Sequence, residues 1–239
     1  LGRGAWSGSH NDLAAGVDLY HTDHSRAGIS VMHTNSSLDR TENLGEVSMK
    51  KKFTRVSLYG RHDFAGGLHA AGDVFAGGIR IKDTSLVDMS TRTAGVHAEV
   101  GVDVPAGRGT ITPLVRAAYA GIRGFTTKDG EGFPFTMKES HYSSFSAGLK
   151  ASLPLSPVSL LTAYAGWGIR TGYDIDGTMS DAWNTMDISE SGKEHVKTLG
   201  IGYRCDVTPF ARLSLSAARE FSSGLHDDWN FQVSAAYKF

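Results

Sequence analysis

Residues Trp229–Phe239 read W-N-F-Q-V-S-A-A-Y-K-F, and the order of side chains in this stretch decides the fold. Every second residue, from Trp229 to Phe239, is apolar, and the residues between them are mostly polar. Successive side chains of a β-strand point to opposite faces, so the stretch predicts a strand with one wholly apolar face and one mostly polar face.

The same alternation recurs along the chain and predicts twelve strands. Residues 145–153 and 199–207 repeat it most clearly, whereas 68–82 is less regular. The shortest of the twelve spans is the first. The predicted strands are 2–9, 12–22, 26–34, 46–62, 68–82, 90–104, 110–125, 141–154, 158–173, 193–207, 211–221 and 228–239.

The connections between these strands alternate in length. Short turns are predicted at 23–25, 63–67, 105–109, 155–157 and 208–210, and longer loops at 35–45, 83–89, 126–140, 174–192 and 222–227. Outer-membrane barrels have short periplasmic turns and longer external loops. We therefore predict an all-β fold, a 12-stranded antiparallel transmembrane β-barrel with short periplasmic turns, longer external loops and both termini on the periplasmic side.

Composition excludes several other classes. The 239 residues carry a formal net charge of −1, so there is no basic excess for nucleic-acid binding. A single cysteine, Cys205, excludes a disulfide within the chain, and no apolar run reaches the roughly 18 residues of a membrane helix. The chain starts at Leu1 and lacks a secretory signal, so we expect missing upstream segments.

Charges are predicted to line the inside of the barrel. A charge that faces hydrocarbon at the midplane costs about 2–4 kcal/mol, so the apolar faces must point outward. The inward residues of both signs are Asp18, Glu99, Asp103, Arg116, Lys150, Arg170, Arg204, Asp206 and Arg212. They predict a narrow, wet, ion-paired lumen. Inward glycines have two interpretations: they leave space for another segment, or they relieve crowding between tilted strands.

Several strands also resemble a known family. The matching segments are Trp6, Gly16-Val17-Asp18, Ala27-Gly28-Ile29, Pro113 with Tyr119, Ala163–Trp167, and the terminal Ala236–Phe239. Together they resemble the C-terminal translocator (β-domain) of autotransporters, the type V secretion proteins. The resemblance covers nearly the whole chain, although the first predicted strand is unusually short for that family.

This resemblance implies a single barrel domain, 1–239, at the C-terminus of a longer precursor in the bacterial outer membrane. Such a domain takes part in moving an N-terminal passenger to the cell surface. The implied partners are outer-membrane lipid, lipopolysaccharide, the passenger with its linker helix, and the barrel assembly machinery. That machinery would read the last strand, through Trp229, Phe231, Val233, Tyr237 and Phe239. The strand count favours a monomer.

No segment predicts a catalytic site, a metal site or a cofactor. Ser7, His10 and Asp12 are too close in sequence to form a hydrolase triad, which joins separate elements. Some autotransporters cut their own passenger with residues inside the pore, but no motif selects one of the inward carboxylates here. Met49–Lys52 lies near the predicted outer leaflet, where its lysines either pair with lipopolysaccharide phosphates or belong to a solvated loop–strand junction.

Two other functions remain open from the sequence. An outer-membrane enzyme barrel, such as a phospholipase or surface protease, would need Ser, His and Asn or Asp together on the wall or rim. A narrow diffusion channel would be expected to have a lining of one sign, whereas the predicted lining is mixed.

Overall fold

The computed structural model describes residues 6–42, 45–83, 88–128, 134–172, 175–180, 185–190, 192–223 and 227–237. Within these ranges the regular structure is β, apart from the 3-10 turn η1 (Ala65–Gly67). None of the described helices is long and apolar enough to cross a membrane. The strands are β1 Trp6–His21, β2 Ser25–Glu42, β3 Gly45–Asp63, β4 Leu68–Asp83, β5 Asp88–Val102, β6 Val104–Ala106, β7 Gly109–Ile122, β8 Phe125–Lys128, β9 Pro134–Met137, β10 Ser140–Ser156, β11 Ser159–Thr171, β12 Ile175–Ser180, β13 Thr185–Glu190, β14 Lys193–Asp206, β15 Ala211–Ser222 and β16 Asp227–Tyr237.

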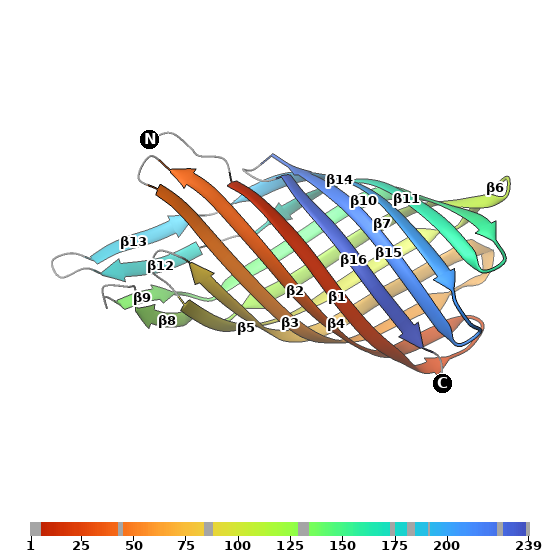
Figure 1. Cartoon of the computed structure of the whole chain (residues 1–239), viewed down its shortest axis with the longest axis horizontal. Coiled ribbons are helices and arrows are strands. Elements are labelled where there is room, and N and C mark those ends of the chain that lie inside the picture. The colour runs from red at the N-terminus through yellow and green to blue at the C-terminus, as the bar shows by residue number, and fades with distance from the viewer. Residues whose placement is uncertain are drawn as a thin grey trace.

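Eleven of these strands close into a barrel (Figure 1). The large sheet has twelve strands in the order β10-β11-β14-β15-β16-β1-β2-β3-β4-β5-β7-β6, and β10 also pairs with β7. The β10–β7 pairing closes the ring and leaves the short β6 outside it, paired with β7. The predicted all-β closed barrel is therefore confirmed, with eleven strands in the ring.

The predicted count of twelve is wrong at the start of the chain. The predicted strands 2–9 and 12–22 are one strand, β1, which pairs with β2 from Trp6↔Arg40 to His21↔Arg26. The predicted break falls at His10 and Asn11, and both continue the ladder. Polar residues do not end a strand whose backbone groups still have partners. For the same reason the predicted loop 35–45 is wrong, because 35–42 extends β2.

An odd number of strands changes how the ring closes. β1 and β16 pair in parallel, from His10↔Asn230 to Val17↔Tyr237, whereas the other neighbours in the ring are antiparallel. As a result, β1 begins at one end of the barrel and β16 ends at the other (Figure 1). The prediction that both termini lie on one side is wrong for the described strands, because that arrangement needs an even count.

The two longest connections lie at one end of the barrel, as the sequence predicted, but β2 and β3 are joined at that same end by only two residues, between Glu42 and Gly45. Residues 22–24 and 207–210 are short turns, whereas 123–139 and 172–192 join strands at the other end. These two long connections are more than loops. β8 with β9 and β12 with β13 form hairpins that pair into a separate four-stranded sheet, β13-β12-β9-β8, which projects from the barrel (Figure 1).

The barrel has an apolar exterior. Among the described residues the buried hydrophobic side chains are Ile79, Leu114 and Val196. Large apolar side chains such as Leu199 and Phe231 are instead more than half exposed. Along β5 the exposed and less exposed residues alternate without a break, so the apolar face points out of the ring. An exterior of this kind is stable in a hydrocarbon environment.

Candidate functional site

The predicted charged residues lie on strands of the ring or directly after one of them. They have the opposite alternation to the exposed apolar residues of the same strands. Most are partly buried, and Arg204 is exposed. Their positions are Asp18 on β1, Glu99 on β5, Asp103 between β5 and β6, Arg116 on β7, Lys150 on β10, Arg170 on β11, Arg204 and Asp206 on β14, and Arg212 on β15.

Glu99 and Arg116 form an ion pair across two strands. The residues are direct partners in the β5–β7 ladder, and Arg116 Nε lies 2.7 Å from Glu99 Oε2. The Glu99 side chain is 13% exposed and that of Arg116 is 34% exposed. The Arg116 guanidinium also lies 4.5 Å above the ring of Tyr164. The strand register places the two groups beside each other. Their hydrogen bond therefore connects β5 to β7 and neutralises one charge of each sign.

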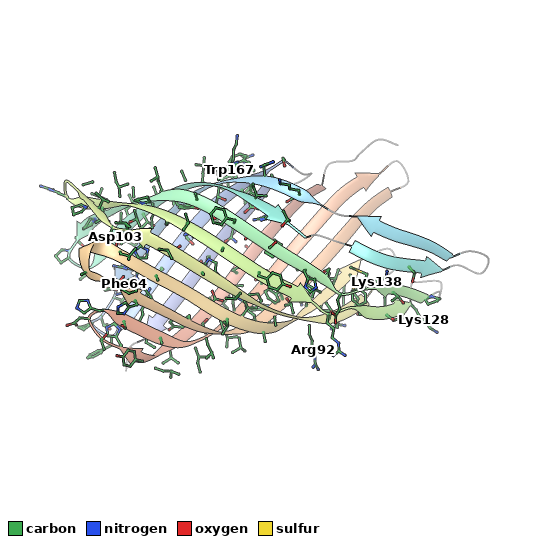
Figure 2. All side chains as sticks on the ribbon, turned by 180° about the vertical axis from the view of Figure 1, so that it is seen from behind. Phe64, Arg92, Asp103, Lys128, Lys138 and Trp167 are labelled. Atoms are coloured by element: carbon green, nitrogen blue, oxygen red, sulfur yellow. The ribbon has the colours of Figure 1, made fainter. Side chains whose placement is uncertain are left out.

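A buried histidine joins this pair to a second carboxylate. His69 on β4 is fully buried, with Nε2 3.6 Å from Glu99 Oε1 and Nδ1 3.8 Å from Asp103 Oδ2. Neither ring nitrogen has a hydrogen-bond partner. Asp103 also accepts a hydrogen bond from the buried Thr112 hydroxyl. Figure 2 shows Asp103 near the end of the barrel that carries the short turns.

Sequence reasoning missed His69 and Thr112. The alternation on β4 would have placed His69 inward on the same face as Asp73, but the two glycines at 77–78 obscured the period. Thr112 gave no signal, because a threonine on a strand is ordinary. Only the ladder shows that His69 lies beside Gly101, where a Cβ atom would approach the imidazole to 2.8 Å.

Other predicted residues form separate pairs around the wall. The Tyr59 hydroxyl donates to Asp18 Oδ1 at 2.5 Å, and Arg212 Nε donates to Asp206 Oδ1 at 2.6 Å. Arg170 and Glu220 form an ion pair across the intervening strand β14. In the described part of the chain, Lys150 and Arg204 have no carboxylate within 4 Å. Among the predicted inward charges, most are therefore paired, and Lys150 and Arg204 are the two cations without a carboxylate beside them in the described ranges.

The inner glycines accommodate aromatic rings. Gly28 and Tyr59 are partners in the β2–β3 ladder, and a Cβ atom at Gly28 would lie 2.6 Å from the Tyr59 hydroxyl oxygen. Phe75 covers Gly95 in the same manner, and Tyr164 covers Gly148 and Gly166. These contacts support the second interpretation of the inward glycines, namely that they relieve local crowding.

Gly28→Val is expected to destabilise the barrel by about 1–3 kcal/mol, the usual cost of overpacking. A Cβ atom at residue 28 would approach the backbone oxygen of Val17 to 2.2 Å, and a backbone atom cannot move aside cheaply. Urea titration of the refolded barrel measures the loss. Gly60→Val is the matched control, because its nearest atom, the Arg26 oxygen, is 3.7 Å away. Equal losses for the two variants would contradict the contact.

The last strand carries an exposed aromatic cluster. Trp229 and Phe231 on β16 are 47% and 52% exposed, and their rings stack at 5.9 Å. Arg219 on β15 lies 4.6 Å from the Phe221 ring and 5.5 Å from the Trp229 ring. Val233 is also exposed, whereas the Tyr237 side chain and the whole of Phe239 lie outside the described residues. This strand presents an apolar outer surface along its described length.

The described residues hold no group of three or more His, Cys, Asp or Glu side chains placed to bind a metal ion.

Asp12, which the sequence placed near Ser7 and His10, accepts a hydrogen bond from Thr34 at 2.5 Å and lies 3.4 Å from the Asn230 amide nitrogen. These contacts tie β1 to β2 and β16.

The chain is similar to one family and to several solved barrels. The sequence profile described as the autotransporter β-domain matches residues 2–218. The β-domain of the Bordetella autotransporter BrkA has a TM-score of 0.63 at 14% identity, over 95% of this chain and 96% of that one. The transport unit of AIDA-I from Escherichia coli has a TM-score of 0.63 at 16% identity and aligns over 95% of this chain and 84% of that one. The translocator domain of NalP from Neisseria meningitidis has a TM-score of 0.60 at 16% identity and aligns over 100% of this chain and 90% of that one. No curated protein sequence matches the chain.

Proposed function

The chain belongs to the autotransporter β-domain family, and from this premise we propose that it anchors and helps to secrete an N-terminal passenger across the bacterial outer membrane. The observation that carries this proposal is the closed barrel with an apolar exterior and a charged, ion-paired interior. A passenger segment could pass through or with such a pore, while the exterior holds the domain in lipid.

Several partners follow from this function. Outer-membrane lipid and lipopolysaccharide would surround the apolar exterior. The barrel assembly machinery would read the exposed face of β16, which includes Trp229, Phe231 and Val233, and the terminal residues Tyr237 and Phe239. The end with the short turns would face the periplasm. A closed ring has no free strand edge to pair with a second copy, so we propose a monomer.

Conductance in planar bilayers tests the pore. We expect the chain 1–239 to form an open channel, and a version that carries about 40 further upstream residues of the precursor to be closed, because the linker helix would then fill the lumen. Two closed forms, or two forms that conduct equally with solute selectivity, would contradict the translocator and favour the enzyme barrel or the narrow diffusion channel.

We also infer that residues 1–239 are one domain of a longer precursor, in which the complete barrel has twelve antiparallel strands. The parallel β1–β16 pair supports this inference. The two strands run in the same direction, so a strand inserted between them in the opposite direction would make both new pairs antiparallel. The upstream precursor would supply that strand, and the ring would then have an even count.

A cysteine pair tests the inserted strand. Leu13 and Val233 are direct partners across the β1–β16 pair, and both are exposed. In the precursor, with Cys205→Ala as background, Leu13→Cys with Val233→Cys is expected to give no disulfide. An inserted strand would separate the two residues by about 9.5 Å, twice the strand spacing, which is beyond the reach of about 7 Å.

Leu215→Cys with Val233→Cys is the matched positive control, because these residues are direct partners on β15 and β16. It is expected to crosslink in both the precursor and the chain 1–239. If the Leu13 pair crosslinks in the precursor as fully as this control, the parallel pair persists there and the twelve-stranded form is wrong.

A further inference from the structure

Basic side chains gather on the outer face of the barrel near the end with the long connections. They lie on neighbouring strands, above the apolar band, and share the alternation of the exposed residues. They are Lys50, Lys52, Arg80, Lys82, Arg92 and Arg123. The described acidic side chains on the same face are Asp88 and Glu139. The described side chains of this surface therefore carry a positive excess, although the whole chain is close to neutral.

Arg92 and Arg123 are among the cations of this surface that lack an acidic partner in the described part of the chain. Asp88 forms ion pairs with Arg80 at 2.8 Å and Lys82 at 3.0 Å. Arg92 lies on β5, and Arg123 lies opposite it, directly after β7. The backbone N–H of Arg123 donates to the backbone carbonyl of Arg92 at 2.9 Å. Within the described ranges, neither guanidinium has a carboxylate within 4 Å. Like charges on adjacent strands repel each other, and an anion between them would remove the repulsion.

An apolar groove of about 730 Å³ begins beside these arginines and runs along the outer face. Small residues leave it open, and its outward lining includes Val56, Ala76, Gly78, Ala94 and Gly121. Beside it, the rings of Tyr119 and His141 stack at 5.8 Å, with the hydroxyl oxygen 2.9 Å from Nδ1. Figure 2 shows Arg92 projecting outward from the barrel wall. The groove and the guanidinium groups thus form one amphipathic surface.

We propose that this surface binds a phosphorylated lipid of the outer leaflet, the lipid A part of lipopolysaccharide. Arg92 and Arg123 hold a phosphate, since guanidinium groups form strong paired hydrogen bonds with phosphate oxygens. An acyl chain lies in the groove over Ala94 and Gly121. The choice of leaflet rests on the proposed function, which turns the long connections toward the cell exterior. Lipid A combines phosphates and acyl chains in one molecule, as the surface requires.

Native mass spectrometry of the purified barrel in neutral detergent, titrated with lipid A, tests the site. Arg92→Gln with Arg123→Gln is expected to weaken binding by about tenfold or more, the size of two lost charge-assisted hydrogen bonds. The matched control is Lys193→Gln with Lys197→Gln on β14, which are also exposed and lie on the same face near the same end. The control should change binding less than about twofold.

A further variant tests the groove separately. Gly121→Leu keeps both arginines and has room for a side chain, because its Cβ atom would be 3.5 Å from the nearest atom, His141 Nδ1. It is expected to weaken the binding of lipid A and to leave inorganic phosphate binding unchanged. Heat-dependent mobility in gel electrophoresis confirms that each variant is folded.

Two lipids decide the identity of the ligand. Lipid A without its phosphates should bind poorly, and phosphatidylglycerol, with one phosphate, should bind more weakly than lipid A. The proposal is overturned if the double arginine variant binds lipid A like the parent, or if either comparison lipid binds as tightly as lipid A. Passenger exposure on intact cells is measured in parallel, so a failed lipid site with normal secretion leaves the proposed function in place.

Discussion

Leu215→Arg is expected to lower the free energy of unfolding of the barrel in lipid vesicles by about 2–4 kcal/mol, the cost of a cation that faces hydrocarbon near the midplane. Leu215 on β15 is 44% exposed on the outer face. Its ladder partners are Tyr203 and Val233, which are exposed too and carry no charge. An arginine at this position would have no counter-ion beside it.

Ser216→Arg is the matched control for this prediction. The residue is adjacent in sequence but faces the lumen, between Gly202 and Gln232, and it is exposed to the open interior. We expect it to change the free energy of unfolding by less than about 0.5 kcal/mol, as for a surface substitution. Urea titration in vesicles measures both variants. If Ser216→Arg costs as much as Leu215→Arg, the inner and outer faces have been assigned wrongly.

Arg116→Met is expected to destabilise the barrel by about 2–3 kcal/mol, somewhat less than the loss of a fully buried partner because Arg116 is one-third exposed. The substitution removes the guanidinium that lies 2.7 Å from Glu99. The carboxylate would then remain partly buried, with His69 Nε2 3.6 Å away and not hydrogen-bonded. A carboxylate that loses its cation in this setting is costly to keep ionised.

A double-mutant cycle separates this loss from lost packing. Glu99→Leu with Arg116→Met removes both charges, and we expect it to be at least about 1 kcal/mol less destabilising than the sum of the single variants. Replacement of an ion pair by apolar residues is often nearly neutral, whereas removal of one partner is not. Additive losses in urea titration would show that the two side chains contribute independently.

Local alternation was enough to predict most of the strands and the face on which each side chain lies. β4, β11 and β14 begin and end within a few residues of their predicted bounds, because a period of two is a property of each strand alone. The charges predicted to face inward alternate with the exposed apolar residues of their strands for the same reason. β8, β9, β12 and β13 were missed, because short polar strands have no marked apolar face and form when a neighbouring hairpin supplies hydrogen bonds.

The candidate sites depended more on register than on pattern. The sequence predicted Glu99 and Arg116 on one face, but only the β5–β7 ladder makes them partners. No sequence motif surrounds His69. Its position between Glu99 and Asp103 follows from the register of β4 and β5, which pairs His69 with Gly101. The basic outer surface is similar, since Arg92 and Arg123 are far apart in sequence and adjacent in the barrel.

Sequence alone therefore established a β-barrel whose strands alternate apolar and polar side chains, with its two longest connections at one end. These features follow from side-chain chemistry along single strands and from the cost of a charge in hydrocarbon. Tertiary structure decided the fusion of the first two predicted strands into β1, the parallel β1–β16 closure and the partner of each charge. These features depend on which backbone groups of distant strands form hydrogen bonds with each other, and that pairing is set only when the ring closes.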